Sequence, residues 1–91
     1  MKLTREEVFE IINGERDYQD ERWNEHTTAS GGKHGPEEWL VYIQDYLTEA
    51  IHIASRKANP EAQELVMEHI RKIGSMCVAA MEQNGVRPRQ K

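Results

Sequence analysis

The sequence predicts an all-α protein of three helices with one long loop between the first helix and the second. Two observations predict this class: three segments carry apolar residues at helical spacing, and a helix-start signal precedes each of them. The stretch between the first two segments has no periodicity and contains three glycines. Because the chain has 91 residues, we expect a single helical domain spanning residues 1–91.

The first helix is expected over about residues 5–23. Thr4 and Glu7 have the spacing of a capping box, which satisfies two backbone N–H groups at a helix start. Gly14 lowers the stability of this helix by about 1 kcal/mol relative to alanine. The apolar stripe that should face the core consists of Val8, Ile11, Ile12 and Tyr18.

Residues 24–35, NEHTTASGGKHG, form the expected loop, which is near the length at which structureless loops become uncommon unless they are functional or disordered. Pro36 stands at a position favoured for the first residue of a helix, so the second helix is expected over about residues 36–57. Its apolar face is formed by Trp39, Leu40, Ile43, Leu47, Ala50, Ile51 and Ala54.

The third helix is expected over about residues 60–84, because Asn59-Pro60 is a strong start signal and Asn84-Gly85 a typical end. A basic tail over residues 86–91 follows, either as a solvated terminus or as an arm that contacts phosphate. Its basic residues are Arg87, Arg89 and Lys91.

Between Ile73 and Met81 almost every residue is apolar or small, which predicts burial on more than one side of the third helix. In so short a chain the natural second partner is another copy, so we expect a homo-oligomer of helical-bundle type that assembles through the third helix. Cys77 lies among small and apolar neighbours, which favours a buried packing thiol over a reactive one. A single cysteine excludes an internal disulfide.

Charge and hydropathy exclude several classes of function. The formal net charge of −4 argues against non-specific nucleic-acid binding, which needs a basic surface. No apolar stretch is long enough to span a bilayer, and the segment MKLTREEVFE has no apolar signal core. We therefore expect a cytoplasmic protein without a membrane partner.

Polar residues continue the apolar stripe of the first helix, and the first of them, Glu15, is a candidate site residue. The stripe runs on through Glu15, Gln19 and Arg22. A buried carboxylate is costly unless it is paired or bound to a metal. The structural alternative is that Glu15 bonds Gln19, pairs with an arginine of the third helix or reaches solvent.

Asp45 and Glu49 are four residues apart on the polar side of the second helix, so their side chains are neighbours. Two carboxylates at this spacing can share Mg²⁺, and a solvated acidic face is the alternative. If the first helix lies beside the second, Glu15 adds a third carboxylate. In the glycine-containing loop, Lys33 and His34 are candidates for contact with a phosphate.

The chain resembles small phage and prophage proteins of MazG-like type over residues 4–89. The segments that carry the resemblance are ERDYQDERW, EEWLVYIQDYLTEA and IRKIGSMCVAAMEQNGVRPR. MazG-like enzymes are all-α nucleoside triphosphate pyrophosphohydrolases that hold Mg²⁺ with E-E-x-x-E on one helix and E-x-x-D on the next. The resemblance therefore implies an all-α fold, a nucleotide ligand and Mg²⁺.

The motif residues are only partly present here. The nearest match to the first motif is Gln44-Asp45-x-x-Thr48, with Glu49 following, and the nearest match to the second is Glu68-x-x-Arg71, where arginine replaces the acid. The metal ligands that the resemblance implies are Asp45, Glu49 and Glu68, which Glu15 could supplement. The candidate ligand-binding residues are Lys33, His34, Arg22 and Arg71.

Because the carboxylate count is low, the sequence favours a non-catalytic helical protein of phage or prophage origin that binds a nucleotide or a host protein. The alternative is a Mg²⁺-dependent MazG-like nucleoside triphosphate pyrophosphohydrolase, in which the metal would polarise phosphoryl oxygens and help to activate water.

Overall fold

Three helices make up the fold in the computed structural model, which describes residues 1–28, 30–56 and 60–90. They are α1 (Arg5–Arg22), α2 (Pro36–Ser55) and α3 (Ala62–Asn84), and no strand occurs in these ranges. The all-α, three-helix prediction is confirmed, and the helix ends differ from the expected ones by at most two residues. No helix in the described ranges has the length and hydropathy needed to cross a membrane.

The helix-start signals are confirmed for α1 and α2. Glu7 N donates to Thr4 Oγ1 at 3.1 Å and Thr4 N donates to Glu7 Oε1 at 2.9 Å, which completes the capping box. Pro36 is the first residue of α2. The residue that precedes α3 is Glu61, and the expected cap Asn59 lies outside the described residues, as do Lys57 and Lys91.

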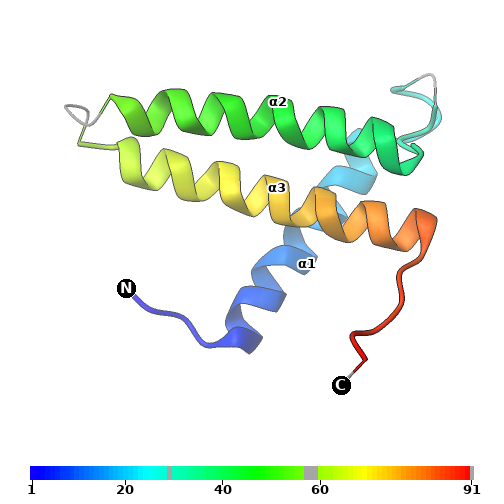
Figure 1. Ribbon diagram of the computed structural model, residues 1–91, viewed down its shortest axis with the longest axis horizontal. Helices are drawn as coiled ribbons and strands as arrows, with labels where there is room; N and C mark the ends of the chain where they lie inside the picture. Colours follow the sequence, from blue (N-terminus) through cyan, green and yellow to red (C-terminus); the bar gives the residue numbers. More distant parts are fainter. Residues whose placement is uncertain (29, 57–59, 91) are drawn as a thin grey trace.

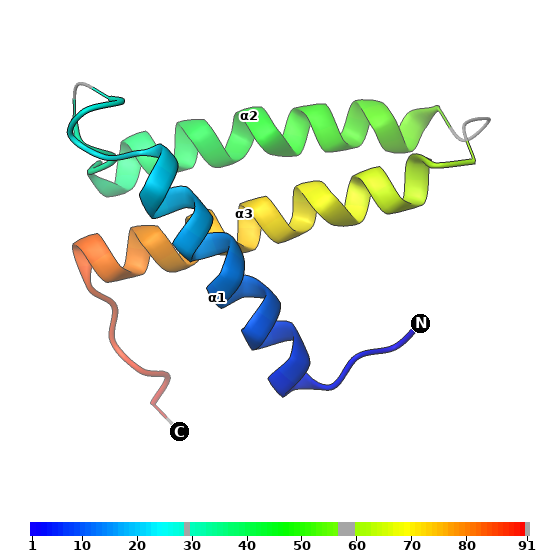
Figure 2. The ribbon, with the colours of Figure 1, turned by 180° about the vertical axis from the view of Figure 1, so that it is seen from behind.

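The helices form a hairpin and one crossing helix. α2 and α3 run antiparallel side by side, and α1 crosses the far side of α3 in Figure 1 and the near side in Figure 2. α1 contacts α3 and makes no contact with α2 in the described part of the chain. The sequence-based hypothesis that the first helix lies beside the second is therefore wrong.

A small core lies where α2 faces α3. Trp39, Met76 and Ala79 are its buried members, with 2 %, 1 % and 1 % of their surface exposed. Partly buried hydrophobic residues pack around them, namely Trp23, Ile43, Tyr46 and Ala80. The large apolar side chains of the core thus gather at the end of the hairpin where the 24–35 loop joins α2.

The contact between α1 and α3 is largely polar, which explains why α1 lies there. Arg16 is buried and donates to Glu82 from Nε at 2.8 Å and from Nη2 at 3.2 Å, and it also bonds Asp20 at 3.0 Å. These bonds raise the pKa of the Arg16 guanidinium and lower the pKa of Glu82. Buried Gln19 donates to the Lys72 carbonyl at 3.4 Å.

The apolar stripe predicted for α1 is only partly correct. Val8, Ile11 and Tyr18 are each more than 40 % exposed. Ile12 does face α3, where its Cδ1 lies 3.1 Å from the position that a Cβ on Gly74 would occupy. The small residues of α3 therefore admit α1 of the same chain, which supplies a second partner for this helix.

Candidate functional site

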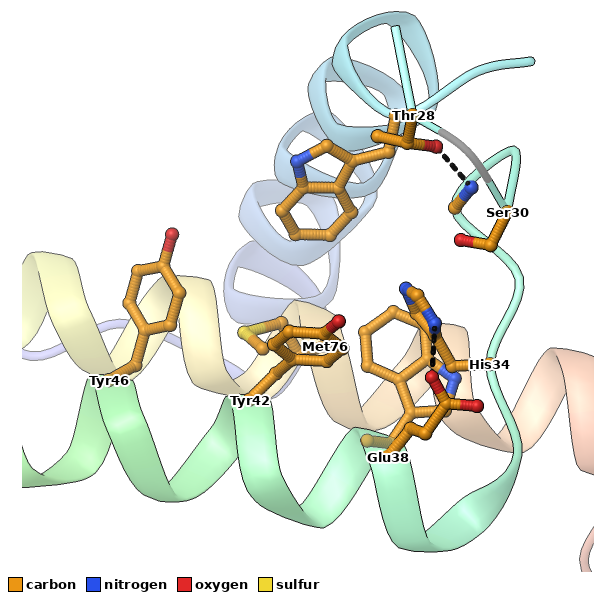
Figure 3. Close-up of a pocket in the computed structure, with 10 residues that line it drawn as sticks. Thr28, Ser30, His34, Glu38, Tyr42, Tyr46 and Met76 are labelled. Carbon is orange, nitrogen blue, oxygen red and sulfur yellow. Dashed lines mark hydrogen bonds and ion pairs between the residues drawn. The ribbon is translucent and has the colours of Figure 1, made fainter.

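An aromatic cleft of about 530 Å³ opens between the end of α1, the 24–35 loop and the first half of α2. Its aromatic lining consists of Trp23, Trp39, Tyr42 and Tyr46, and Met76 of α3 contributes to it as well. Figure 3 shows Tyr42 and Tyr46 rising from α2 toward the space below the loop that carries Thr28 and Ser30. Cavities of this size and apolar character are typical of small-molecule sites.

The loop above the cleft is held by Gln83, at the end of α3. His34 N and Trp39 Nε1 both donate to Gln83 Oε1 at 2.9 Å, and Gln83 Nε2 donates to the Gly32 carbonyl at 2.9 Å. One amide thus joins the loop, α2 and α3. Asn84 adds a bond from Nδ2 to the His34 carbonyl at 3.1 Å.

Gly32 explains part of the glycine content of the loop. Its φ of 76° lies in the left-handed region, and a Cβ here would collide with the carbonyl oxygen of Trp23. Its N–H donates to Thr28 Oγ1 at 2.8 Å. The loop backbone therefore lies directly against Trp23, and this contact closes one wall of the cleft.

His34 and Glu38 lie at the mouth of the cleft. His34 Nδ1 is 3.3 Å from Glu38 Oε2, and the His34 ring meets Trp39 edge-on with centroids 5.1 Å apart. The ring centroid of Tyr42 is 4.8 Å from that of His34. This cluster offers a π surface together with a polar edge that can donate and accept hydrogen bonds.

A smaller cleft of about 130 Å³ adjoins the aromatic cleft, with which it shares Trp23, Tyr46 and Met76. Its polar lining consists of Glu15, Tyr18, Gln19, Arg22 and Lys72. We call it the cationic cleft, because Arg22 and Lys72 form no ion pair with any acid in the described ranges.

The Arg22 guanidinium lies 5.7 Å from the centroid of the Tyr18 ring, so its position is supported by an aromatic face rather than by a carboxylate. By contrast, Glu15 is neutralised: Arg71 Nε donates to Glu15 Oε1 at 2.8 Å. This pair is the structural alternative that the sequence left open for Glu15. The free positive charge of the cationic cleft is therefore carried by Arg22 and Lys72.

The candidate metal ligands do not come together. Asp45 and Glu68 are exposed, and Glu49 Oε2 lies 3.4 Å from Nε2 of His69. Glu15 lies on α1, which packs on α3 rather than α2. Within the described ranges, no group of three or more histidine, cysteine or acidic side chains is placed to hold a metal ion.

The candidate ligand-binding residues divide among different places. His34 lines the aromatic cleft and Arg22 the cationic cleft. Arg71 is occupied by Glu15. Lys33 lines neither cleft and lies in a separate shallow depression with His34, Glu38 and Gln83. The structure thus brings two of the four candidates, His34 and Arg22, to two adjoining clefts, which together we call the groove.

Sequence reasoning missed the aromatic lining and Gln83. The sequence places Trp39 on the apolar face of the second helix and indicates no role for Tyr42 or Gln83. The usable signal was the gathering of aromatic residues on both sides of the glycine-containing loop, at Trp23, Trp39, Tyr42 and Tyr46.

Comparison with known proteins gives no relative. The chain matches no family model, no curated protein and no solved structure.

Proposed function

We propose that this protein binds a nucleotide without hydrolysing it, with the base in the aromatic cleft and the phosphate in the cationic cleft. The observation that carries the proposal is that the two clefts adjoin each other and share Trp23, Tyr46 and Met76 in their linings. A ligand with a planar ring at one end and an anionic group at the other matches this division of the groove.

The lining of the aromatic cleft supports placing the base there. Stacking of a base on an aromatic side chain contributes about 1–3 kcal/mol and tolerates any base, because every base has a π face. Trp23, which is half-buried, and Tyr42, which is 44 % exposed, present two such rings, while Trp39 is 2 % exposed and backs Trp23 with ring centroids 6.3 Å apart. The His34–Glu38 pair beside them supplies donors and acceptors for the edge of a base.

The distribution of charged side chains supports placing the phosphate in the cationic cleft. Arg16 and Arg71 are held by carboxylates of the protein, whereas Arg22 and Lys72 have no such partner in the described part of the chain. Arginine binds phosphate through paired N–H donors, and lysine adds a point charge. The aromatic cleft has Glu38 at its mouth, so the anionic end of a ligand is favoured in the neighbouring cleft.

The test is a titration followed by tryptophan fluorescence, with a panel of nucleosides and their 5′-monophosphates in the absence of Mg²⁺. We expect saturable quenching, with the monophosphate binding at least about tenfold more tightly than its nucleoside. Arg22→Gln should remove most of that difference, whereas Arg5→Gln, at the exposed start of α1, should preserve it. Absence of saturable binding up to about 1 mM would refute the proposal.

The Mg²⁺-dependent pyrophosphohydrolase remains the alternative, and the Asp45–Glu49 pair distinguishes it. Hydrolysis by that route needs the carboxylates of α2 to hold the metal. Under our proposal the double variant Asp45→Asn with Glu49→Gln keeps the nucleotide affinity of the wild type, and neither protein releases pyrophosphate from nucleoside triphosphates with Mg²⁺ present. Pyrophosphate release by the wild type that the double variant loses would favour the enzyme.

A further inference from the structure

One face of the α2–α3 hairpin carries exposed apolar side chains. On α2, Leu40, Leu47 and Ile51 are 65 %, 42 % and 58 % exposed, and their spacings of seven and four residues place them on one side of the helix. On α3, Ile70 and Met81 are 48 % and 45 % exposed. We call this surface the open face, and it consists of Leu40, Leu47, Ile51, Ile70, Cys77 and Met81.

The open face lies on the opposite side of the hairpin from α1. α1 binds α3 through Arg71 and Glu82, and helical periodicity puts Ile70 and Cys77 on a different side of α3. Gly74, against which Ile12 of α1 packs, lies at the edge between the two sides.

On α2, Tyr42 lines the aromatic cleft beside the end of α1, and helical periodicity puts Leu40 and Leu47 on the opposite side of the helix, away from α1. In Figure 1 α1 passes behind the hairpin, and none of the three described helices covers the side toward the viewer.

We propose that a second copy of this chain covers the open face, so that two hairpins form a four-helix bundle related by a two-fold axis. The first reason is area. The exposed side chains of the open face present on the order of 500 Å² of mostly apolar surface, which is at the upper end of the range for the largest apolar patch on a monomer. Together with their neighbours they approach the roughly 800 Å² that each partner contributes to a stable interface.

The second reason is charge. In a dimer with two-fold symmetry, both partners present the same surface to each other. A border that carried charge of one sign would therefore face charge of the same sign. Gln44 and Thr48, which border the open face along α2, and Gln63, which continues its stripe seven residues before Ile70 on α3, are uncharged. An acidic or basic partner would find no complementary charge here, whereas an identical surface meets no repulsion.

The interface of this dimer differs from the one that the sequence predicts. The expected interface was the third helix alone, but two sides of α3 are already covered, by α2 and by α1. The remaining side forms the open face only together with α2. Because the aromatic cleft lies on the α1 side of the hairpin, the dimer keeps two clefts open on its outer surfaces.

The test compares variants by sedimentation velocity over a concentration series and by the rate of Cys77 labelling. We expect the wild type to be a dimer at about 100 μM, with labelling that slows as concentration rises. Ile51→Glu should weaken the dimer at least about 100-fold, because it places a charge on each side of an apolar contact. The matched control is Val41→Glu, which changes a residue of the same helix that is 67 % exposed but lies off the open face.

Val41→Glu should leave both the dimer and the labelling unchanged. A circular dichroism melt of each variant confirms that the helices are intact, which is expected because both positions are solvent-exposed in the single chain. A wild type that stays monomeric at about 100 μM, or an Ile51→Glu protein that remains dimeric, would overturn the proposal.

Discussion

Replacing Gln83 by leucine should loosen the loop that closes the aromatic cleft. The side chain accepts from His34 N and Trp39 Nε1 and donates to the Gly32 carbonyl, and all three distances are 2.9 Å. Leucine keeps most of the volume and removes every bond. At about 1 kcal/mol for each net hydrogen bond, we expect the free energy of unfolding to fall by about 2–3 kcal/mol.

Part of the expected loss in the free energy of unfolding comes from the indole N–H of Trp39. Trp39 is 2 % exposed, so its indole N–H has no access to bulk water once Gln83 is gone, and an unsatisfied buried donor is costly. For a domain of this size the expected loss corresponds to a decrease in Tm of roughly 10–20 °C.

The assay is thermal and urea unfolding followed by circular dichroism, together with tryptophan fluorescence of the folded state. Glu68→Leu is the control, because Glu68 is exposed on the same helix away from the open face and its side chain bonds no described residue. It should change Tm by only a few degrees. An unchanged Tm and an unchanged fluorescence spectrum for Gln83→Leu would refute the role that we assign to this amide.

Other substitutions test single features of the structure. Gly32→Ala should cost about 2–4 kcal/mol in unfolding measurements, because the new Cβ meets the Trp23 carbonyl at a left-handed φ, whereas Gly14→Ala, with open space around it, should raise stability by about 0.5–1 kcal/mol. The bond from Arg16 lowers the pKa of Glu82 from its ordinary 4.5, so the pair stabilises the fold above that pH and loses its effect as pH falls through the lowered pKa. The difference in unfolding free energy between wild type and Glu82→Gln should therefore shrink from about pH 6 to about pH 3, and a constant difference in denaturant titrations would contradict this.

The helices could be predicted because their signals are local. The Thr4–Glu7 capping box, the proline at position 36 and the glycine at position 85 each act within one helical turn, and each has its expected place in the structure. The orientation of α1 could not be predicted. It depends on bonds from Arg16 to Glu82 and from Arg71 to Glu15, whose partners are 66 and 56 residues apart in sequence.

The site was predictable only in part, for the same reason. The sequence singled out His34 and Arg22 by residue type, and both line the groove. Lys72 and Gln83 were missed, since nothing in their local sequence shows that folding brings them to the groove and to the loop. The acidic pair Asp45 and Glu49 satisfied a spacing rule, but a spacing on one helix does not show that other carboxylates come near.

The most direct test of the proposed nucleotide site is a two-dimensional ¹⁵N NMR titration with the nucleoside monophosphate that binds most tightly in the panel. The two tryptophans, at positions 23 and 39, give separate indole N–H signals. We predict that the signal of Trp23 shifts saturably, and that the Arg22 side-chain signal shifts with the same dissociation constant, because one ligand occupies both clefts. Saturable shifts confined to residues outside the groove, or shifts of Trp23 that a nucleoside without phosphate reproduces at equal affinity, would contradict the account.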